Sequence, residues 1–239
     1  TIELNNTFYR PPRTDYCARW VRDVEANPDF LFTAKLWQRF THERDEPWTA
    51  ADVATFRGGI EPLVDAGKLG ALLVQFPWSF HFNDGNCQWL QGVVEEFQDL
   101  PLVVEMRSKE WIGDRALDFL RSLETGFCNV DQPAYKSNIP LTSYAFGGLG
   151  YLRLHGRNYD AWFAEDAGRD ERYDYLYNEE ELDELAAAID EISEQVERMF
   201  VIANNHYGGQ AVATSIQLTE RLTGEHASAP GRIREIYGI

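Results

Sequence analysis

Glu105 and Arg107 form the most informative pair of charged residues in this sequence, because they close an apolar run and stand two residues apart. On an extended strand this spacing puts both side chains on one face. A buried carboxyl group beside a guanidinium is either a satisfied ion pair or a general acid or base whose pKa is set by burial and by the neighbouring positive charge. Both interpretations stay open from the sequence alone.

Glu3 supplies a second carboxyl group near the start of the chain. Two carboxyl groups that flank a glycosidic bond hydrolyse it in many barrel enzymes, provided that they lie roughly 5–9.5 Å apart. A glycosidase-like hydrolase that uses Glu3 and Glu105 is therefore one alternative function.

Basic and amide side chains gather in two places nearer the C-terminus. Arg153, His155 and Arg157 form a basic edge around Gly156, where the backbone can approach a ligand closely. Arginine side chains offer paired donors to a carboxylate or a phosphate. Residues 204–209 (NNHYGG) lead into a helical segment. Such a turn binds phosphate in many barrels, but a glycine-rich turn with asparagine caps explains it equally well.

The candidate residues share one position, the end of an apolar segment. We predict Glu105 as the general base with His155 as its proton partner, and Glu3 as a further catalytic candidate. The predicted substrate-binding residues are Asn5, Lys35, Gln75, Arg107, Arg153, Asn204, Asn205 and Gly208. The five histidines form no His-x-x-x-His or similar array, so the sequence identifies no metal site and no cofactor.

Short apolar runs alternate with amphipathic segments almost from end to end, and this pattern positions the candidates. We predict strands at residues 2–5, 31–36, 71–76, 102–107, 127–130, 151–155 and 199–204, and helices at 14–26, 49–66, 86–98, 114–124, 179–198 and 209–222. Alternation of this kind indicates parallel strands joined by crossover helices. Nearly every strand ends in polar residues, which favours a closed barrel with one common mouth over an open, doubly wound sheet.

The sequence also predicts the ends of some helices and one irregular connection. Thr49 with Asp52 predicts a capping box, and Gly67 and Gly224 stand where helices should stop. The segment between residues 130 and 151 lacks a helical period and contains prolines and glycines that break it. We expect an irregular connection there.

Six sequence blocks follow one another along nearly the whole chain. They are residues 3–9 (ELNNTFY), Lys35 with Thr41-His42, residues 75–77 (QFP), residues 105–107 (EMR) with Trp111, residues 153–156 (RLHG), and Asn204-Asn205 before Gly208 and Ala211. In this order they resemble the YecE-like family, domain of unknown function 72. The resemblance implies a TIM-type (β/α)8 barrel and no established activity. It also implies that this chain, with seven predicted strands, lacks the family's first strand, and we expect truncation.

Composition narrows the functional classes. The chain has 239 residues, 44% of them hydrophobic, which suits a single TIM-barrel-like domain over residues 1–239. A net charge of −17, with only four lysines, argues against nucleic acid as a partner. Three widely spaced cysteines indicate reduced thiols, and no apolar run is long enough to span a membrane, so we expect a cytoplasmic location.

Together these features favour an enzyme that acts on a small anionic substrate, phosphorylated or carboxylated, by general acid–base chemistry at the C-terminal mouth of the barrel. Cationic and amide groups at strand ends of a strongly acidic chain carry this hypothesis. A non-catalytic module that binds nucleic acid or a protein partner is the alternative from another class. The sequence does not decide between enzyme and binding module, and it indicates no oligomeric state.

Overall fold

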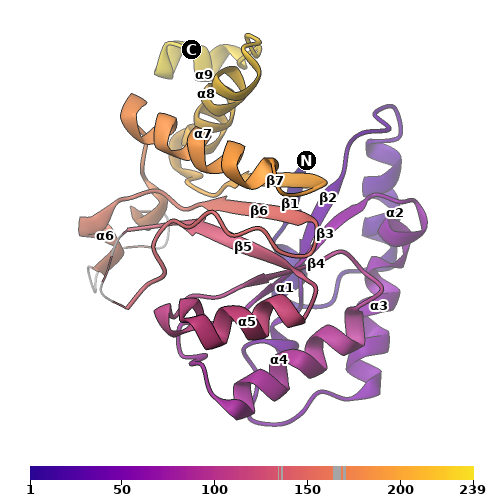
Figure 1. The fold of residues 1–239 in the computed structure, drawn as a ribbon. Helices are drawn as coiled ribbons and strands as arrows, with labels where there is room; N and C mark the ends of the chain where they lie inside the picture. The colour runs from indigo at the N-terminus through magenta and orange to yellow at the C-terminus, as the bar shows by residue number, and fades with distance from the viewer. Residues whose placement is uncertain (134, 136, 164–167, 169–170) are drawn as a thin grey trace. The chain divides into compact units, whose positions relative to one another are not determined.

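The computed structural model describes residues 1–133, 135, 137–163, 168 and 171–239, and has an α/β fold of the TIM type (Figure 1). Its seven strands in these ranges follow sequence order within one parallel sheet. They are β1 (Ile2–Leu4), β2 (Phe32–Lys35), β3 (Leu69–Gln75), β4 (Leu102–Glu105), β5 (Gly126–Asp131), β6 (Leu149–Leu154) and β7 (Arg198–Ala203). The predicted set of strands is therefore confirmed.

Helices follow most strands, as the alternating pattern predicts. They are α1 (Asn6–Tyr9), α2 (Thr14–Asp23), α3 (Ala50–Asp65), α4 (Asp84–Phe97), α5 (Asp114–Ser122), α6 (Tyr159–Phe163), α7 (Glu179–Ser193), α8 (Gln210–Thr223) and α9 (Gly231–Tyr237). Short 3-10 helices span Gln38–Phe40, Lys109–Ile112, Glu171–Tyr173 and Tyr207–Gly209. The described part of residues 132–148 contains no helix, in agreement with the irregular connection expected there.

The chain divides into two compact units, Thr1–Phe127 and Cys128–Ile239. The first contains β1 to β4 with the helices that connect them, and the second contains β6 and β7 with α6 to α9. The prediction of a single domain over residues 1–239 stays a prediction. No helix in the described ranges is long and apolar enough to cross a membrane.

The first unit is built around β3, whose central residues 71–74 are fully buried, as expected for a parallel strand covered on both faces. The capping box predicted at the start of α3 is present, because Thr49 and Asp52 each accept a hydrogen bond from the other's backbone N–H. At Gly59 of α3, a Cβ atom would lie 2.3 Å from the carbonyl oxygen of Pro12. Close packing of the loop before α2 against α3 therefore requires glycine at this position.

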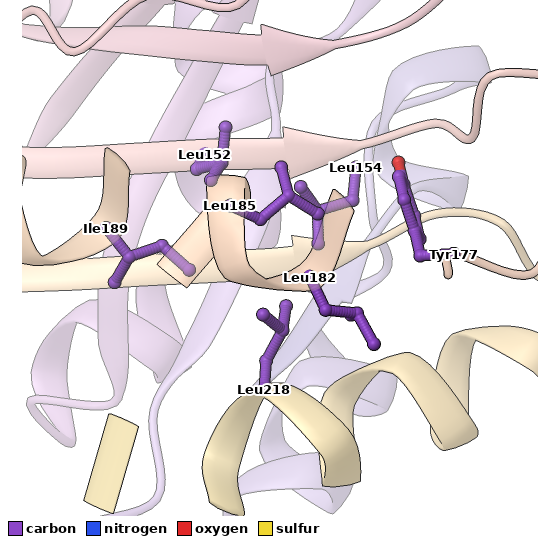
Figure 2. Close-up of a cluster of buried hydrophobic side chains, with 7 residues drawn as sticks. All are labelled: Leu152, Leu154, Tyr177, Leu182, Leu185, Ile189 and Leu218. Atoms are coloured by element: carbon purple, nitrogen blue, oxygen red, sulfur yellow. The ribbon is translucent and has the colours of Figure 1, made fainter. Parts of the chain in front are cut away.

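The core of the second unit lies between β6, α7 and α8 (Figure 2). Leucine side chains of β6 face an apolar stripe on α7, and one leucine of α8 closes the cluster. Its members are Leu152, Leu154, Tyr177, Leu182, Leu185, Ile189 and Leu218. The acidic run Glu179–Glu181 at the start of α7 thus belongs to the polar side of an amphipathic helix. The backbone of Gly224 adopts a left-handed conformation (φ +69°) and ends α8, also as predicted.

Candidate functional site

The first unit brings charged and polar side chains together at the C-terminal ends of β2 and β4 and in the loop after β2. We call Lys35, His42, Arg44, Glu105 and Arg107 the Glu105 cluster. His42 lies within electrostatic reach of the other four members. Parallel strands end at the same edge of a sheet, so the side chains that follow β2 and β4 are placed on one side.

Glu105 is the buried centre of this cluster. Its side chain is 0% exposed, and its Oε1 atom lies 2.5 Å from Nε of Arg107, which is 17% exposed. The predicted neighbourhood of these two residues is confirmed, although β4 ends at Glu105 and Arg107 lies just beyond it. Gln75 of β3 stands in register with Glu105, and its Nε2 donates to the carbonyl of Phe76 (2.6 Å).

Phe8 forms an aromatic platform beneath two members of the cluster. The Nζ atom of Lys35 lies 3.8 Å from the centre of the Phe8 ring, a cation–π contact. The ring of His42 meets the same ring edge to face, with the ring centres 4.8 Å apart. The hydroxyl of Thr7 holds α1 in place by contacting the carbonyl oxygens of Leu4 (2.7 Å) and Lys35 (2.6 Å). Short helix α1 thereby delivers Phe8 to the end of β2.

His42 was not a predicted site residue, because its acidic loop suggests a solvated turn. In the structure the imidazole is partly buried, and its Nδ1 lies 2.8 Å from Oγ1 of Thr41. Burial lowers the pKa of His42 to about 4, with further lowering by the positive charges of Lys35, Arg44 and Arg107, while Glu105 opposes the shift. His42 is therefore a neutral imidazole at neutral pH. The sequence did offer one indication of a role for His42, because Thr41-His42 belongs to one of the six blocks that resemble the YecE-like family.

Glu3 lies on β1, the first strand of the sheet, and Asn5 follows this strand and precedes α1. Glu3 stands in register with Thr33 of β2 and is partly buried. The carbonyl of Asn5 accepts a hydrogen bond from the backbone N–H of Phe8 (3.3 Å). In the described ranges, no group of three or more histidine, cysteine, aspartate or glutamate residues could hold a metal ion.

The second unit places His155 and Asn204 together, as predicted for neighbouring strand ends. Nδ2 of Asn204 lies 3.0 Å from Nδ1 of His155, which is 1% exposed. Because the ring nitrogen that faces the amide N–H acts as acceptor, this contact fixes both the tautomer and the orientation of the imidazole. Arg153 is buried on β6 in register with Ile202.

Asn205 and Gly208 shape the turn between β7 and α8. Nδ2 of Asn205 donates to the carbonyl of Tyr175 (2.9 Å) and to Oγ1 of Thr214 (2.9 Å), so this amide group already joins elements of the fold. Gly208 has a positive φ of 58°, which glycine adopts without strain. Its carbonyl accepts a hydrogen bond from the hydroxyl of Tyr237 in α9 (2.9 Å).

A buried polar network at the end of β5 was missed by the sequence analysis. Oδ1 of Asp131 accepts from Nε of Arg157 (2.9 Å), and Oδ2 accepts from the hydroxyl of Tyr177 (2.6 Å). Nη1 of Arg157 also donates to Glu184 (2.8 Å), so this arginine of the predicted basic edge is engaged with carboxylates. Burial raises the pKa of Asp131, while hydrogen bonds from Arg157 and Tyr177 oppose the rise.

The family model described as "Protein of unknown function DUF72" matches residues 1–235 of this chain. The chain belongs to the DUF72 family. A curated relative, "UPF0759 protein YunF" of Bacillus subtilis (strain 168), is 28% identical over 251 residues, which cover 99% of this chain and 88% of that protein. The predicted membership is thus confirmed.

Solved DUF72 structures share the fold. A DUF72 family protein from Thermotoga maritima MSB8 is 35% identical with a TM-score of 0.81, covering 92% of this chain and 84% of the other. A DUF72 family protein from Enterococcus faecalis V583 is 27% identical with a TM-score of 0.83, covering 95% and 86%. These similarities confirm the TIM-type fold class of this DUF72 chain. The names of these relatives state no reaction.

Proposed function

We propose that this DUF72 protein is an enzyme that acts on a small anionic substrate, phosphorylated or carboxylated, by general acid–base chemistry at the Glu105 cluster. One observation carries the proposal: the charges of three cations, Lys35, Arg44 and Arg107, act on the partly buried His42 together with that of Glu105, a buried carboxylate paired with Arg107, in a chain whose net charge is −17. Such a local excess of positive charge attracts an anion that the rest of the molecule repels.

Lys35 and Arg107 are the proposed anion-binding residues of this site. A guanidinium presents five N–H donors in a rigid fork, so Arg107 is able to hold both Glu105 and an oxyanion of the substrate. The ammonium group of Lys35 is oriented by the face of Phe8. Glu105 then acts as general base on a proton of the bound substrate, and Arg107 stabilises its ionised form.

The roles of the site residues in the second unit are predictions. Arg153, Asn204, Asn205 and Gly208 are predicted to bind substrate, and His155 is predicted to exchange a proton with Glu105. The contact between Asn204 and His155 supports a role for a single oriented tautomer of the imidazole. The amide of Asn205 is the weakest member of this set, because its Nδ2 is already used by Tyr175 and Thr214.

Anion-induced stabilisation tests the proposal. Thermal unfolding is measured with inorganic phosphate, sulfate and small carboxylic acids, for the wild type and for Lys35→Met and Lys109→Met. Lys109 is exposed in a 3-10 helix, so K109M makes the same charge change at an exposed position. We expect anions to raise the unfolding temperature of the wild type and K109M and to lose most of this effect in K35M. Equal responses in all three proteins, or no response in the wild type, would refute anion binding at this site.

Glu105→Gln separates binding from chemistry. E105Q keeps the shape of the side chain but cannot take up a proton, so it should still bind anions and should lose turnover of any phosphosugar or small acid found by screening. Turnover that survives in E105Q would remove Glu105 from the mechanism.

The glycosidase-like alternative depends on the separation of the Glu3 and Glu105 carboxyl groups. Glu3 and Glu105 lie on β1 and β4, which are separated by two strands in the sheet. A carboxyl separation outside roughly 5–9.5 Å would exclude this alternative. This alternative and the binding module stay predictions.

A further inference from the structure

Arg44 is a partly buried cation that no carboxylate contacts directly in the part of the chain that the structure describes. It follows the 3-10 helix Gln38–Phe40 in the loop after β2. Its guanidinium lies over the Phe80 ring, with Cζ 4.7 Å from the ring centre, and Nη1 donates to Oδ1 of Asn86 (3.0 Å). No carboxylate oxygen of the described residues comes within 4 Å of it, and Nε is buried with no hydrogen-bond partner there.

Several other partly buried arginines in the described ranges are, by contrast, paired with carboxylates. Arg107 contacts Glu105, Arg157 contacts Asp131, and Arg221 contacts Glu179. An arginine held on an aromatic ring by a neutral amide keeps its full charge for another anion. Glu43 and Asp45 of its own loop are exposed. The charge of Asp45 reaches Arg44 through space and raises its pKa, but burial has the larger effect and lowers the pKa.

His42 is the titratable neighbour of Arg44. The charged groups that face it are Lys35, Arg44 and Arg107 on the positive side and Glu105 on the negative side. Their combined field, together with burial, keeps the imidazole uncharged. A bound anion offsets the net positive charge of these groups and so favours protonation of the imidazole. The hydroxyl of Thr41 can donate or accept a hydrogen bond, so its contact with Nδ1 persists when the ring is protonated.

We propose that an oxyanion of the substrate binds against Arg44 and that its binding is coupled to uptake of one proton by His42. The inference rests on the proposed function, since it names the anion anchor and the proton acceptor of that same site. The proton comes from solvent and no covalent bond changes. At neutral pH, His42 becomes a cation only when the anion is bound. Its protonated ring then adds a positive charge and a further N–H donor to those of Arg44.

Proton uptake makes the affinity depend on pH in a defined direction. An opposite charge within contact distance raises a histidine pKa by about 1–3 units. Between the pKa of His42 in the free protein, about 4, and the higher pKa in the complex, the affinity should increase as the pH falls. The limiting slope is about tenfold per pH unit for one proton, and the slope vanishes above the higher pKa.

The experiment uses inorganic sulfate, whose charge is constant across the range, with the whole chain. Sulfate affinity is measured by calorimetry from about pH 8 to about pH 5, in buffers of different ionisation enthalpy that report proton uptake, and the His42 ring is titrated by NMR. The variants are Arg44→Gln, His42→Gln and Arg19→Gln. Arg19 is 73% exposed on α2, so R19Q controls for the loss of one positive charge.

We expect wild type and R19Q to bind sulfate more tightly at low pH with proton uptake. R44Q should lose about tenfold or more in affinity, and H42Q should bind with no proton uptake. In the free protein, R44Q should also raise the pKa of His42, a change that lost packing on Phe80 would not produce. Sulfate binding to R44Q at wild-type strength, or proton uptake that persists in H42Q, would overturn the inference and leave the proposed function intact. Absence of sulfate and phosphate binding in the wild type would remove both.

Discussion

Replacing His42 by Gln isolates the contribution of one buried imidazole to acid sensitivity. The unfolded chain titrates His42 near its ordinary pKa of 6.5, and burial with neighbouring cations lowers the pKa to about 4 in the folded protein. Between these two values the unfolded state binds more protons than the folded state. Stability from this group is therefore present above pH 6.5 and is lost as the pH falls toward 4.

The magnitude follows from the two pKa values. The full shift corresponds to about 3 kcal/mol between the protonation states, and about 2 kcal/mol of it is lost between about pH 7 and about pH 5. His42→Gln removes this titration, so the free energy of unfolding of H42Q should fall by about 2 kcal/mol less than that of the wild type over the same interval. Any packing cost of the substitution is the same at both pH values and cancels.

Urea unfolding at the two pH values measures the difference directly. His226→Gln is the comparison variant: the His226 side chain is 82% exposed and contacts Glu220 at the surface. An exposed contact of this kind contributes little to stability, so H226Q should lack the protection on acidification that is expected of H42Q. If H42Q loses as much stability on acidification as the wild type, His42 titrates normally in the folded protein. The Glu105 cluster then holds no excess of positive charge around His42.

Two further substitutions test the packing arguments by urea unfolding. Tyr177→Phe removes a hydroxyl that donates to Asp131 and accepts from the backbone N–H of Gly156. The free energy of unfolding should therefore fall by about 2–4 kcal/mol. A fall of less than about 0.5 kcal/mol would show that this network contributes little to stability. Gly59→Ala should destabilise the protein by about 1–3 kcal/mol, because the alanine Cβ would meet the Pro12 carbonyl oxygen. Gly58→Ala should stabilise the protein by about 0.5–1 kcal/mol, because a Cβ at position 58 has open space around it and alanine favours the helix. Equal effects of the two alanines would refute the close approach to Pro12.

The strands and long helices could be predicted because each carries a clear apolar pattern and recognisable ends. The short elements could not. Helix α1 has four residues, too few for a helical period, and α9 has seven residues, none of them buried, so no apolar stripe marks it. Strand β6 was expected to include His155 but ends at Leu154, before Gly156 takes a positive φ of 85°.

Some residues of the candidate site could likewise be predicted from the sequence, and others could not. Glu105 and Arg107 were found because their spacing along one strand fixes their neighbourhood. The link between Asp131 and Tyr177 spans 46 residues, and no periodicity connects a strand end to a loop tyrosine at that distance. His42 was set aside because loop composition reports the average environment of a segment, whereas its burial depends on Phe8, which a different element delivers.

The position of Lys35 over the Phe8 ring has a practical consequence for spectroscopy. Nuclei above the face of an aromatic ring are shielded by its ring current, so the Lys35 methylene protons next to Nζ should resonate upfield of ordinary lysine signals. With four lysines in the whole sequence, such a signal is readily assigned by substitution. A molecule that draws the ammonium away from the ring would move the signal downfield, which gives a label-free reporter for ligand screening.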